Sequence, residues 1–309
     1  MSMENSNPIA ISTAWNYDLK ANVKDTLSQI RKLGFNAIEI GYNFTPEKLD
    51  KLISFAKDMD IKVVSIHNFC PMPNESMPGR HLSNCFRVSS LDKKERMKAV
   101  DYTKRTIDTA CRVSCNALVF HAGTIELEEK DVSVLLQMYR EGKSDSKEYD
   151  SLKERLLKSR KAKKYPYLDA VIKSLEEITL FANSANIKIG LETRYYPHEI
   201  PDLDEIENLL NIFGDKGLVY WHDVGHAEAN DKLGITSHEN FLARFKDYMF
   251  GIHIHGIKGI DDHLAPFTGD FDFSKVKPYL RDNLIKVIEA HLPATPEELI
   301  KAKELLKDV

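Results

Sequence analysis

The chain has few cysteines, no long apolar run and no excess of positive charge, and each absence narrows what the protein can be. No uninterrupted apolar stretch approaches the ~18 residues of a membrane span, and residues 1–8 lack the basic and apolar regions of a secretion signal. A formal net charge of −4 argues against a nucleic-acid partner bound through its phosphate backbone. No Cys-x-x-Cys spacing occurs, which argues against a zinc–thiolate site and for buried, reduced thiols in a cytoplasmic protein; the four cysteines are Cys70, Cys85, Cys111 and Cys115.

What the sequence does contain is a regular alternation of short apolar runs and amphipathic segments. The apolar runs predict eight strands, at Ile9–Ile11, Ala37–Ile40, Lys62–His67, Ala117–His121, Ile187–Glu192, Leu218–Trp221, Met249–His255 and Leu284–Ala290. Helical patterns with recognisable ends lie between them, such as the one closed by Gly34, the one capped by Thr45 with Pro46 at its first position, and the capping box at Thr295–Glu298. This order predicts an α/β protein, a single (β/α)8 TIM barrel over residues 1–309.

One segment interrupts the alternation after the fourth strand, at about residues 124–167. It is highly charged and ends in a basic run made of Lys153, Arg155, Lys158, Arg160, Lys161, Lys163 and Lys164. A solvated helix is the simpler interpretation of this run. A lid that carries positive charge to an anionic substrate is the alternative.

The predicted strand ends carry one chemical kind of residue. In a barrel of this type, functional side chains lie at the carboxyl ends of the strands and in the loops that follow. Imidazoles and carboxylates occupy those positions on six consecutive strands: His67, His121, Glu192, Asp223, His226, His253, Asp261, His263 and Glu289. Any one of them alone could be a hydrogen-bonded core residue. Together they would be a dense cluster with few cationic partners, and burying unpaired carboxylates is costly. Divalent cations resolve that conflict, so the sequence predicts a metal site.

The other histidines are expected to have lesser roles. We expect His253, and not His255, to face the inside of the barrel. His222, His255 and His291 are expected to point away from the centre and to support the site at most. Surface positions are predicted for His81, His198 and His238.

Several fragments together resemble a known superfamily. They are His67-Asn68-Phe69, His121-Ala122-Gly123, Leu191-Glu192-Thr193-Arg194, His222-Asp223-Val224-Gly225-His226, and His253 through Gly269. This set resembles the xylose-isomerase-like TIM barrels, which include sugar phosphate isomerases and epimerases and also endonuclease IV (apurinic/apyrimidinic, or AP, endonuclease family 2). The resemblance covers most of the chain but not the insertion.

The resemblance to the isomerases implies one divalent ion held by Glu192, Asp223, His253 and Glu289. In such enzymes one glutamate removes a proton next to a carbonyl, a second returns it, and the metal stabilises the enediolate. Glu192 and Glu289 are then the acid/base pair, and His226 resembles the histidine that holds a substrate hydroxyl near the metal.

The resemblance to the endonucleases implies a larger site with up to three zinc ions. It adds His67, His121, His226, Asp261 and His263 to the same ligands, for hydrolysis of a phosphoester. Two departures stand against DNA cleavage: Phe267-Thr268-Gly269 replaces the expected Gly-Glu-Gly, and His255-Gly256-Ile257 replaces the expected Asn-Asp-Ser.

The favoured hypothesis is a metal-dependent sugar or sugar-phosphate isomerase or epimerase that uses one Zn, Mn, Mg or Co ion. The alternative is a phosphoester hydrolase with two or three zinc ions, acting on a small phosphorylated metabolite and not on DNA. A non-catalytic sugar-binding barrel is the third possibility. In either enzyme, Arg194 and Lys258 are candidates to hold a substrate phosphate. A small-molecule substrate and a possible homo-oligomer complete the expectation.

Overall fold

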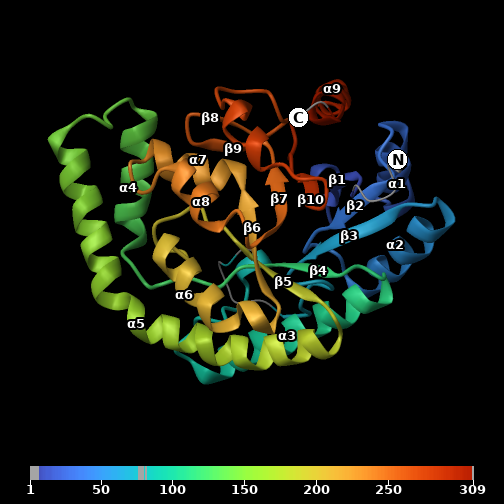
Figure 1. The fold of residues 1–309 in the computed structure, drawn as a ribbon, viewed down its shortest axis with the longest axis horizontal. Coiled ribbons are helices and arrows are strands. Elements are labelled where there is room, and N and C mark those ends of the chain that lie inside the picture. Colours follow the sequence, from blue (N-terminus) through green and yellow to red (C-terminus); the bar gives the residue numbers. More distant parts are fainter. Residues whose placement is uncertain (1–6, 76–79, 81, 308–309) are drawn as a thin grey trace.

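A closed barrel of eight parallel strands forms the centre of the molecule. The computed structural model of the chain describes residues 7–75, 80 and 82–307 (Figure 1). The barrel strands are β1 (Ile9–Ser12), β2 (Ala37–Ile40), β3 (Lys62–His67), β4 (Ala117–Phe120), β5 (Lys188–Glu192), β6 (Leu218–Asp223), β7 (Met249–Ile254) and β10 (Ile285–Ile288). Their order around the barrel is β1-β10-β7-β6-β5-β4-β3-β2, so each strand lies beside its sequence neighbour and β10 closes on β1. The predicted (β/α)8 barrel is confirmed.

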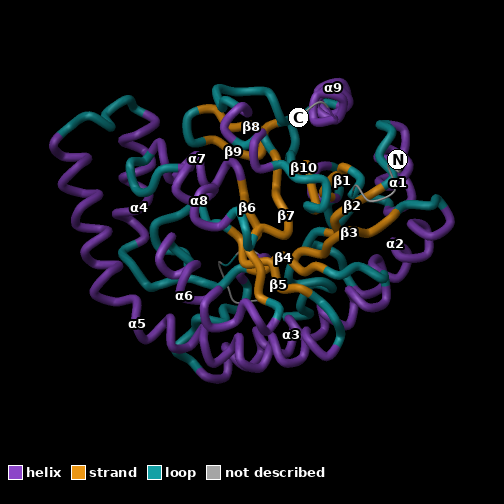
Figure 2. Tube along the Cα trace, in the orientation of Figure 1, coloured by secondary structure: helices purple, strands orange, loops and turns teal. Residues whose placement is uncertain are grey.

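Helices cover the outside of the barrel and surround the strands in Figure 2. They are α1 (Val23–Lys32), α2 (Pro46–Asp58), α3 (Lys93–Arg112), α4 (Glu129–Arg140), α5 (Lys147–Ser184), α6 (Leu203–Phe213), α7 (Val224–Lys232), α8 (His238–Phe245) and α9 (Pro296–Lys307). Thr45 caps α2 through its side chain, as predicted. At α9 the predicted capping box is present, because Thr295 and Glu298 each accept the other's backbone N–H.

The insertion after β4 is helical, and it does not end where the sequence pattern suggested. Helix α4 is followed by α5, a helix of 38 residues that runs through Pro166 and joins the insertion and the barrel helix before β5 into one element. Helix α4 and the first part of α5 lie to one side of the barrel, and α5 then continues along the outside of the barrel next to α3 (Figure 1). The side chains of Lys158, Lys161 and Lys163 are exposed, in keeping with the simpler interpretation of the basic run as a solvated face, whereas Arg160 of the same run is buried in an ion pair with Glu205.

The connection from β7 to β10 differs from the other β/α units. It begins with an antiparallel hairpin, β8 (Gly256–Lys258) and β9 (Asp261–Leu264). Only two short 3-10 turns follow, at Phe273–Lys275 and Lys277–Tyr279, in place of an α-helix. The hairpin therefore covers the carboxyl end of the barrel with residues that directly follow β7.

Trp221 fills the barrel interior beneath the strand ends. Its side chain is fully buried, and its ring lies where a Cβ on Gly190 or Gly251 would be, 2.8 Å and 2.2 Å from the nearest ring atom respectively. The ring also lies edge-on to His253, with centroids 5.4 Å apart. Glycine on the two flanking strands thus makes room for the indole that supports the site from below.

The expectations for the cysteines and for membrane-spanning segments can be compared with the structure. Cys70, Cys85 and Cys115 are buried free thiols as expected, whereas Cys111 is exposed because it lies on the outer face of α3. Within the described residues, no helix combines the length and the apolar character that crossing a membrane would require.

Candidate metal centre

Three carboxylates converge on one imidazole nitrogen at the carboxyl end of the barrel. Glu192 ends β5, Asp223 ends β6, Glu289 directly follows β10, and His253 is the last residue but one of β7. The Nδ1 atom of His253 lies 2.8 Å from Glu192 Oε1, 2.8 Å from Glu289 Oε2 and 3.6 Å from Asp223 Oδ2. A nitrogen can donate one hydrogen at most, so these carboxylates cannot all be satisfied by it.

Asp223 gives a direct test of whether the group fits a cation. Its Oδ1 atom accepts the backbone N–H of His226 at 2.7 Å and lies 3.0 Å from His255 Nε2. Its Oδ2 atom is buried and makes no hydrogen bond within the described residues. A buried oxygen that lacks a donor and faces two other carboxylates is what a divalent ion would complete. The four residues offer ligand atoms within 4.8 Å of one another, so they fit an ion.

The electrostatics of the four residues agree with this fit. Burial acts to raise the pKa of Glu192, but His121 and Arg194 outweigh it and hold that pKa well below its usual value. Burial acts to lower the pKa of His253, yet Glu289 and Glu39 raise it well above its usual value. The carboxylates are therefore ionised at neutral pH, and His253 carries the proton that a bound cation would displace.

Glu39 also belongs to this group of contacts, and the sequence analysis did not predict it. It lies in β2, is fully buried, and both of its oxygens are 3.1 Å from His253 Nε2. Ser65 in β3 donates its hydroxyl to Glu39 Oε2 at 2.7 Å. The available signal was a lone carboxylate inside an otherwise apolar strand, in the sequence Ala-Ile-Glu-Ile.

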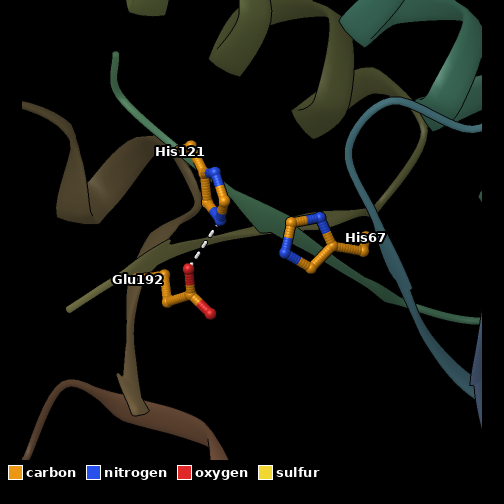
Figure 3. A group of neighbouring side chains, drawn as sticks. All are labelled: His67, His121 and Glu192. Carbon is orange, nitrogen blue, oxygen red and sulfur yellow. Dashed lines mark ion pairs between the residues drawn. The ribbon is translucent and has the colours of Figure 1, made fainter. Parts of the chain in front are cut away.

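A second group of possible ligands consists of His67, His121 and Glu192 (Figure 3). His121 Nε2 lies 2.7 Å from Glu192 Oε2, and the rings of His67 and His121 are perpendicular with centroids 4.7 Å apart. Burial, with a contribution from His121, lowers the pKa of His67 to about 3, and burial and Arg194 lower the pKa of His121. Both imidazoles are neutral at pH 7, the form that binds metals.

The third group is His226, Asp262 and His263, and it departs from the prediction at one residue. Asp262, not Asp261, lies next to the histidines, 3.0 Å from His263 Nδ1 and 3.6 Å from His226 Nε2. Asp261 is exposed and pairs with Arg140 at 3.0 Å. The β8–β9 pairing contains a register shift, which changes the residue of the hairpin that faces inward.

The second and third groups differ in their charge balance. Burial opposes a proton on His263, but its hydrogen bond to Asp262 raises the pKa of His263 to about 9. The same contact lowers the pKa of Asp262, against the effect of burial, to about 2. His263 and Asp262 therefore form an ion pair in which each charge has a partner. His67 and His121 are neutral imidazoles and form no such pair with each other.

Three of the expectations for the remaining histidines were wrong. His255 does not point away from the centre, since residues two apart on a strand share a face and His255 contacts Asp223. His291 lines the cavity at the strand ends, stacks on His263 with centroids 4.1 Å apart, and forms a further group of possible ligands with His263 and Glu289. His238 is fully buried and lies 3.0 Å from Glu228 Oε2.

The placement of the other three histidines varies. His222 does point away from the centre, toward His238 on the outside of the barrel, at 3.0 Å. His198 is half-buried and stacks on Tyr196. His81 lies outside the described residues.

The candidate phosphate ligands are not free in the cavity. Arg194 is buried and forms ion pairs with Glu192 and with Glu199, the latter at 2.7 Å. Lys258 lies at the end of β8 with an exposed side chain, and the cavity at the strand ends is lined by other residues. Arg140 of α4 is among the residues that line that cavity, and it pairs with Asp261.

A polar cavity lies over these groups of possible ligands. One part, of about 200 Å³, is lined by residues that include Tyr42, His67, Glu192 and Glu289. The adjoining part, of about 290 Å³, is lined by residues that include Tyr195 and Tyr196. The two parts share Arg194, His226 and His263. A small, highly hydroxylated molecule suits such a lining better than an apolar one.

The chain belongs to the xylose isomerase-like TIM barrel family, whose model matches residues 27–308. No curated protein sequence matches the chain.

Solved structures with the same fold include sugar epimerases and an AP endonuclease. A D-tagatose 3-epimerase-like protein is 20% identical with a TM-score of 0.65, covering 98% of this chain and 96% of its own. The 3-keto-D-glucoside 4-epimerase from E. coli is 14% identical with a TM-score of 0.67, covering 98% of this chain and 100% of its own. The AP endonuclease family 2 protein from Brucella melitensis is 13% identical with a TM-score of 0.64, covering 95% and 97%. At these identities the likeness establishes the fold.

Proposed function

We propose that the protein is a divalent-metal-dependent sugar isomerase or epimerase. The observation that carries this proposal is the convergence of Glu192, Asp223 and Glu289 on His253 Nδ1, together with the unsatisfied Asp223 Oδ2. The likeness to sugar epimerases supports the same reaction class. A bound ion would stabilise the negative charge that develops on an enediolate.

Glu192 and Glu289 are the proposed acid/base pair. They come from strands on opposite sides of β7 and β6 in the barrel order, and both reach the same point, His253 Nδ1, at 2.8 Å. One carboxylate can remove a proton next to a carbonyl while the other returns it to the neighbouring carbon or to the opposite face. His226, which lines both parts of the cavity, is placed to hold a substrate hydroxyl.

An uncharged sugar fits the described residues better than a sugar phosphate. Arg194 already forms ion pairs with Glu192 and Glu199. Arg140, which lines the cavity, already forms one with Asp261. Ketoses such as D-tagatose, D-psicose and L-ribulose, which appear in the names of the structural neighbours, are the first substrates to test.

The test is hydrogen exchange with solvent during turnover. The purified protein, supplied with Mn²⁺ or Zn²⁺, is incubated with each ketose in D2O, and recovered sugars are analysed by NMR and mass spectrometry. We expect an isomer or epimer that carries deuterium at the carbon next to the carbonyl. Glu192→Gln and Glu289→Gln should each reduce the rate by roughly 10²- to 10⁴-fold, the usual contribution of a general acid or base.

The matched control is Glu205→Gln, which replaces a buried glutamate of α6 that pairs with Arg160 and belongs to none of the groups of possible ligands. It should keep the wild-type rate. An active protein whose turnover is unaffected by Glu289→Gln would contradict the acid/base assignment.

A phosphoester hydrolase is the second candidate, and one observation favours it. The His67–His121–Glu192 and His226–Asp262–His263 groups could hold further ions, which a proton transfer does not require. Release of phosphate or of p-nitrophenol from p-nitrophenyl esters, with severe loss in His67→Ala and His263→Ala, would support hydrolysis in place of isomerisation.

A further inference from the structure

Glu39 occupies a place where a carboxylate is costly. It is fully buried within β2, and all four residues of that strand are buried. Among the described residues no lysine or arginine pairs with it, and its hydrogen-bond partners are His253 and Ser65. A buried carboxylate placed against a histidine of the ion-binding group calls for a reason other than stability.

The reason lies in how Glu39 meets the histidine. Both carboxylate oxygens are 3.1 Å from His253 Nε2, while Nδ1, on the other side of the ring, faces the three carboxylates of the site. The hydroxyl of Ser65 fixes Glu39 from a neighbouring strand. The imidazole is therefore held between a single acceptor on one side and the ion-binding group on the other.

The two neutral forms of the ring are not equivalent in this setting. If the hydrogen is on Nε2, it is donated to Glu39 and the Nδ1 lone pair points into the site. If the hydrogen is on Nδ1, the Nε2 lone pair faces a carboxylate, which is repulsive, and Nδ1 has no lone pair for an ion. Glu39 thus selects the form of His253 that can act as a ligand.

We propose that Glu39 is a positioning residue of the metal centre, which fixes the Nε2–H form and the ring orientation of His253 so that Nδ1 is presented to the divalent ion. Carboxylates that accept the second N–H of a metal-binding histidine act in this way in other proteins. This inference rests on the proposed function, since it takes the four-residue group to hold an ion. It adds a fifth residue, from β2, that makes no contact with the ion itself.

The test compares metal affinity across variants by calorimetric titration of chelator-stripped protein with Mn²⁺ and with Zn²⁺. Glu39→Gln keeps an acceptor but loses the charge, and we expect affinity roughly 10-fold weaker than in the wild type. Glu39→Ala leaves Nε2 without an acceptor and should weaken binding by roughly 100-fold. Ser65→Ala removes one support of Glu39 and should fall between the wild type and Glu39→Gln.

Thermal unfolding of the metal-free proteins separates positioning from a structural role. Glu205→Gln is the control for loss of a buried glutamate: it should lower the melting temperature without changing metal affinity. If Glu39→Ala does not fold, Glu39→Gln and Ser65→Ala still provide the comparison.

The possible outcomes distinguish the two proposals. If the Glu39 variants bind metal as tightly as the wild type, the proposed role of Glu39 is overturned and the proposed function is left intact. Absence of Mn²⁺ and Zn²⁺ binding in the wild type would overturn the metal-dependent function, and the role of Glu39 with it. Weaker binding in the Glu39 variants alone, with Glu205→Gln like the wild type, supports the inference.

Discussion

Buried charges in this barrel are of two kinds, and individual residues illustrate each kind. Arg160 of α5 meets Glu205 of α6 at 2.6 Å and also pairs with Asp202, so its charge is balanced by neighbours on the helices. Glu192, Asp223 and Glu289 meet at the barrel end with less positive charge than negative. The first kind is expected to stabilise the fold, and the second to need a cation.

The first prediction at this scale concerns Glu205. Burial acts to raise its pKa, but Arg160 and the backbone N–H of Asp202 outweigh burial and lower the pKa below the usual 4.5. Glu205→Gln removes the charge from a charge-assisted hydrogen bond. It should therefore reduce the free energy of unfolding at pH 7 by roughly 2–3 kcal/mol, measured by urea denaturation.

The pH dependence of that effect follows from the lowered pKa. A depressed folded-state pKa contributes stability that is fully present above the unfolded value of 4.5 and is lost as pH falls through the folded value. The difference between wild type and Glu205→Gln should accordingly be largest at pH 6–8 and shrink below about pH 4. A difference that stays constant from pH 7 to the acid limit would contradict the ion-pair origin.

At the scale of elements, glycines on two strands decide where the central tryptophan lies. Gly190 on β5 and Gly251 on β7 flank Trp221, which in turn contacts the ring of His253. A side chain at either position would displace the indole, because the barrel interior is closely packed.

Gly251→Ala tests this arrangement. The new Cβ would lie 2.2 Å from the Trp221 ring, so the ring or the strand must move. We expect a loss of roughly 1–3 kcal/mol in the free energy of unfolding, the usual cost of overpacking. Gly214→Ala is the matched control, since its nearest neighbour is 4.0 Å away and its φ is helical, and it should be neutral or slightly stabilising.

The elements also show how much of this molecule the sequence could predict. Strand ends such as His67 and Glu192 were predicted correctly because a buried parallel strand is a continuous apolar run that stops at its polar end. The identity of the carboxylate beside His263 was missed because it depends on a register shift in the β8–β9 hairpin, for which periodicity gives no signal. His255 was placed wrongly because the prediction put it and His253 on opposite faces of the strand, whereas residues two apart on a strand share a face.

At the scale of the whole molecule, the barrel gathers ligands that lie far apart in the sequence. Glu39 and His253 are 214 residues apart, and Glu192 and His253 are 61 apart. An ion held by Glu192, Asp223, His253 and Glu289 would join four strands of the barrel, and Glu39 would connect β2 to them through His253. Because such a site forms only in the folded state, binding should stabilise the fold as a whole by mass action.

The number of ions per chain tells the two candidate functions apart. We expect about one divalent ion per chain by elemental analysis of protein purified without chelator, because the four-residue group has a buried oxygen that lacks a donor, whereas His263 and Asp262 already pair with each other. Glu192→Ala should abolish this content and His263→Ala should preserve it. Removing the ion with a chelator should lower the melting temperature of the wild type and leave that of Glu192→Ala unchanged. Two or three ions, mainly zinc and reduced by His263→Ala, would instead place the hydrolase ahead of the isomerase, because the additional histidines would then be ligands.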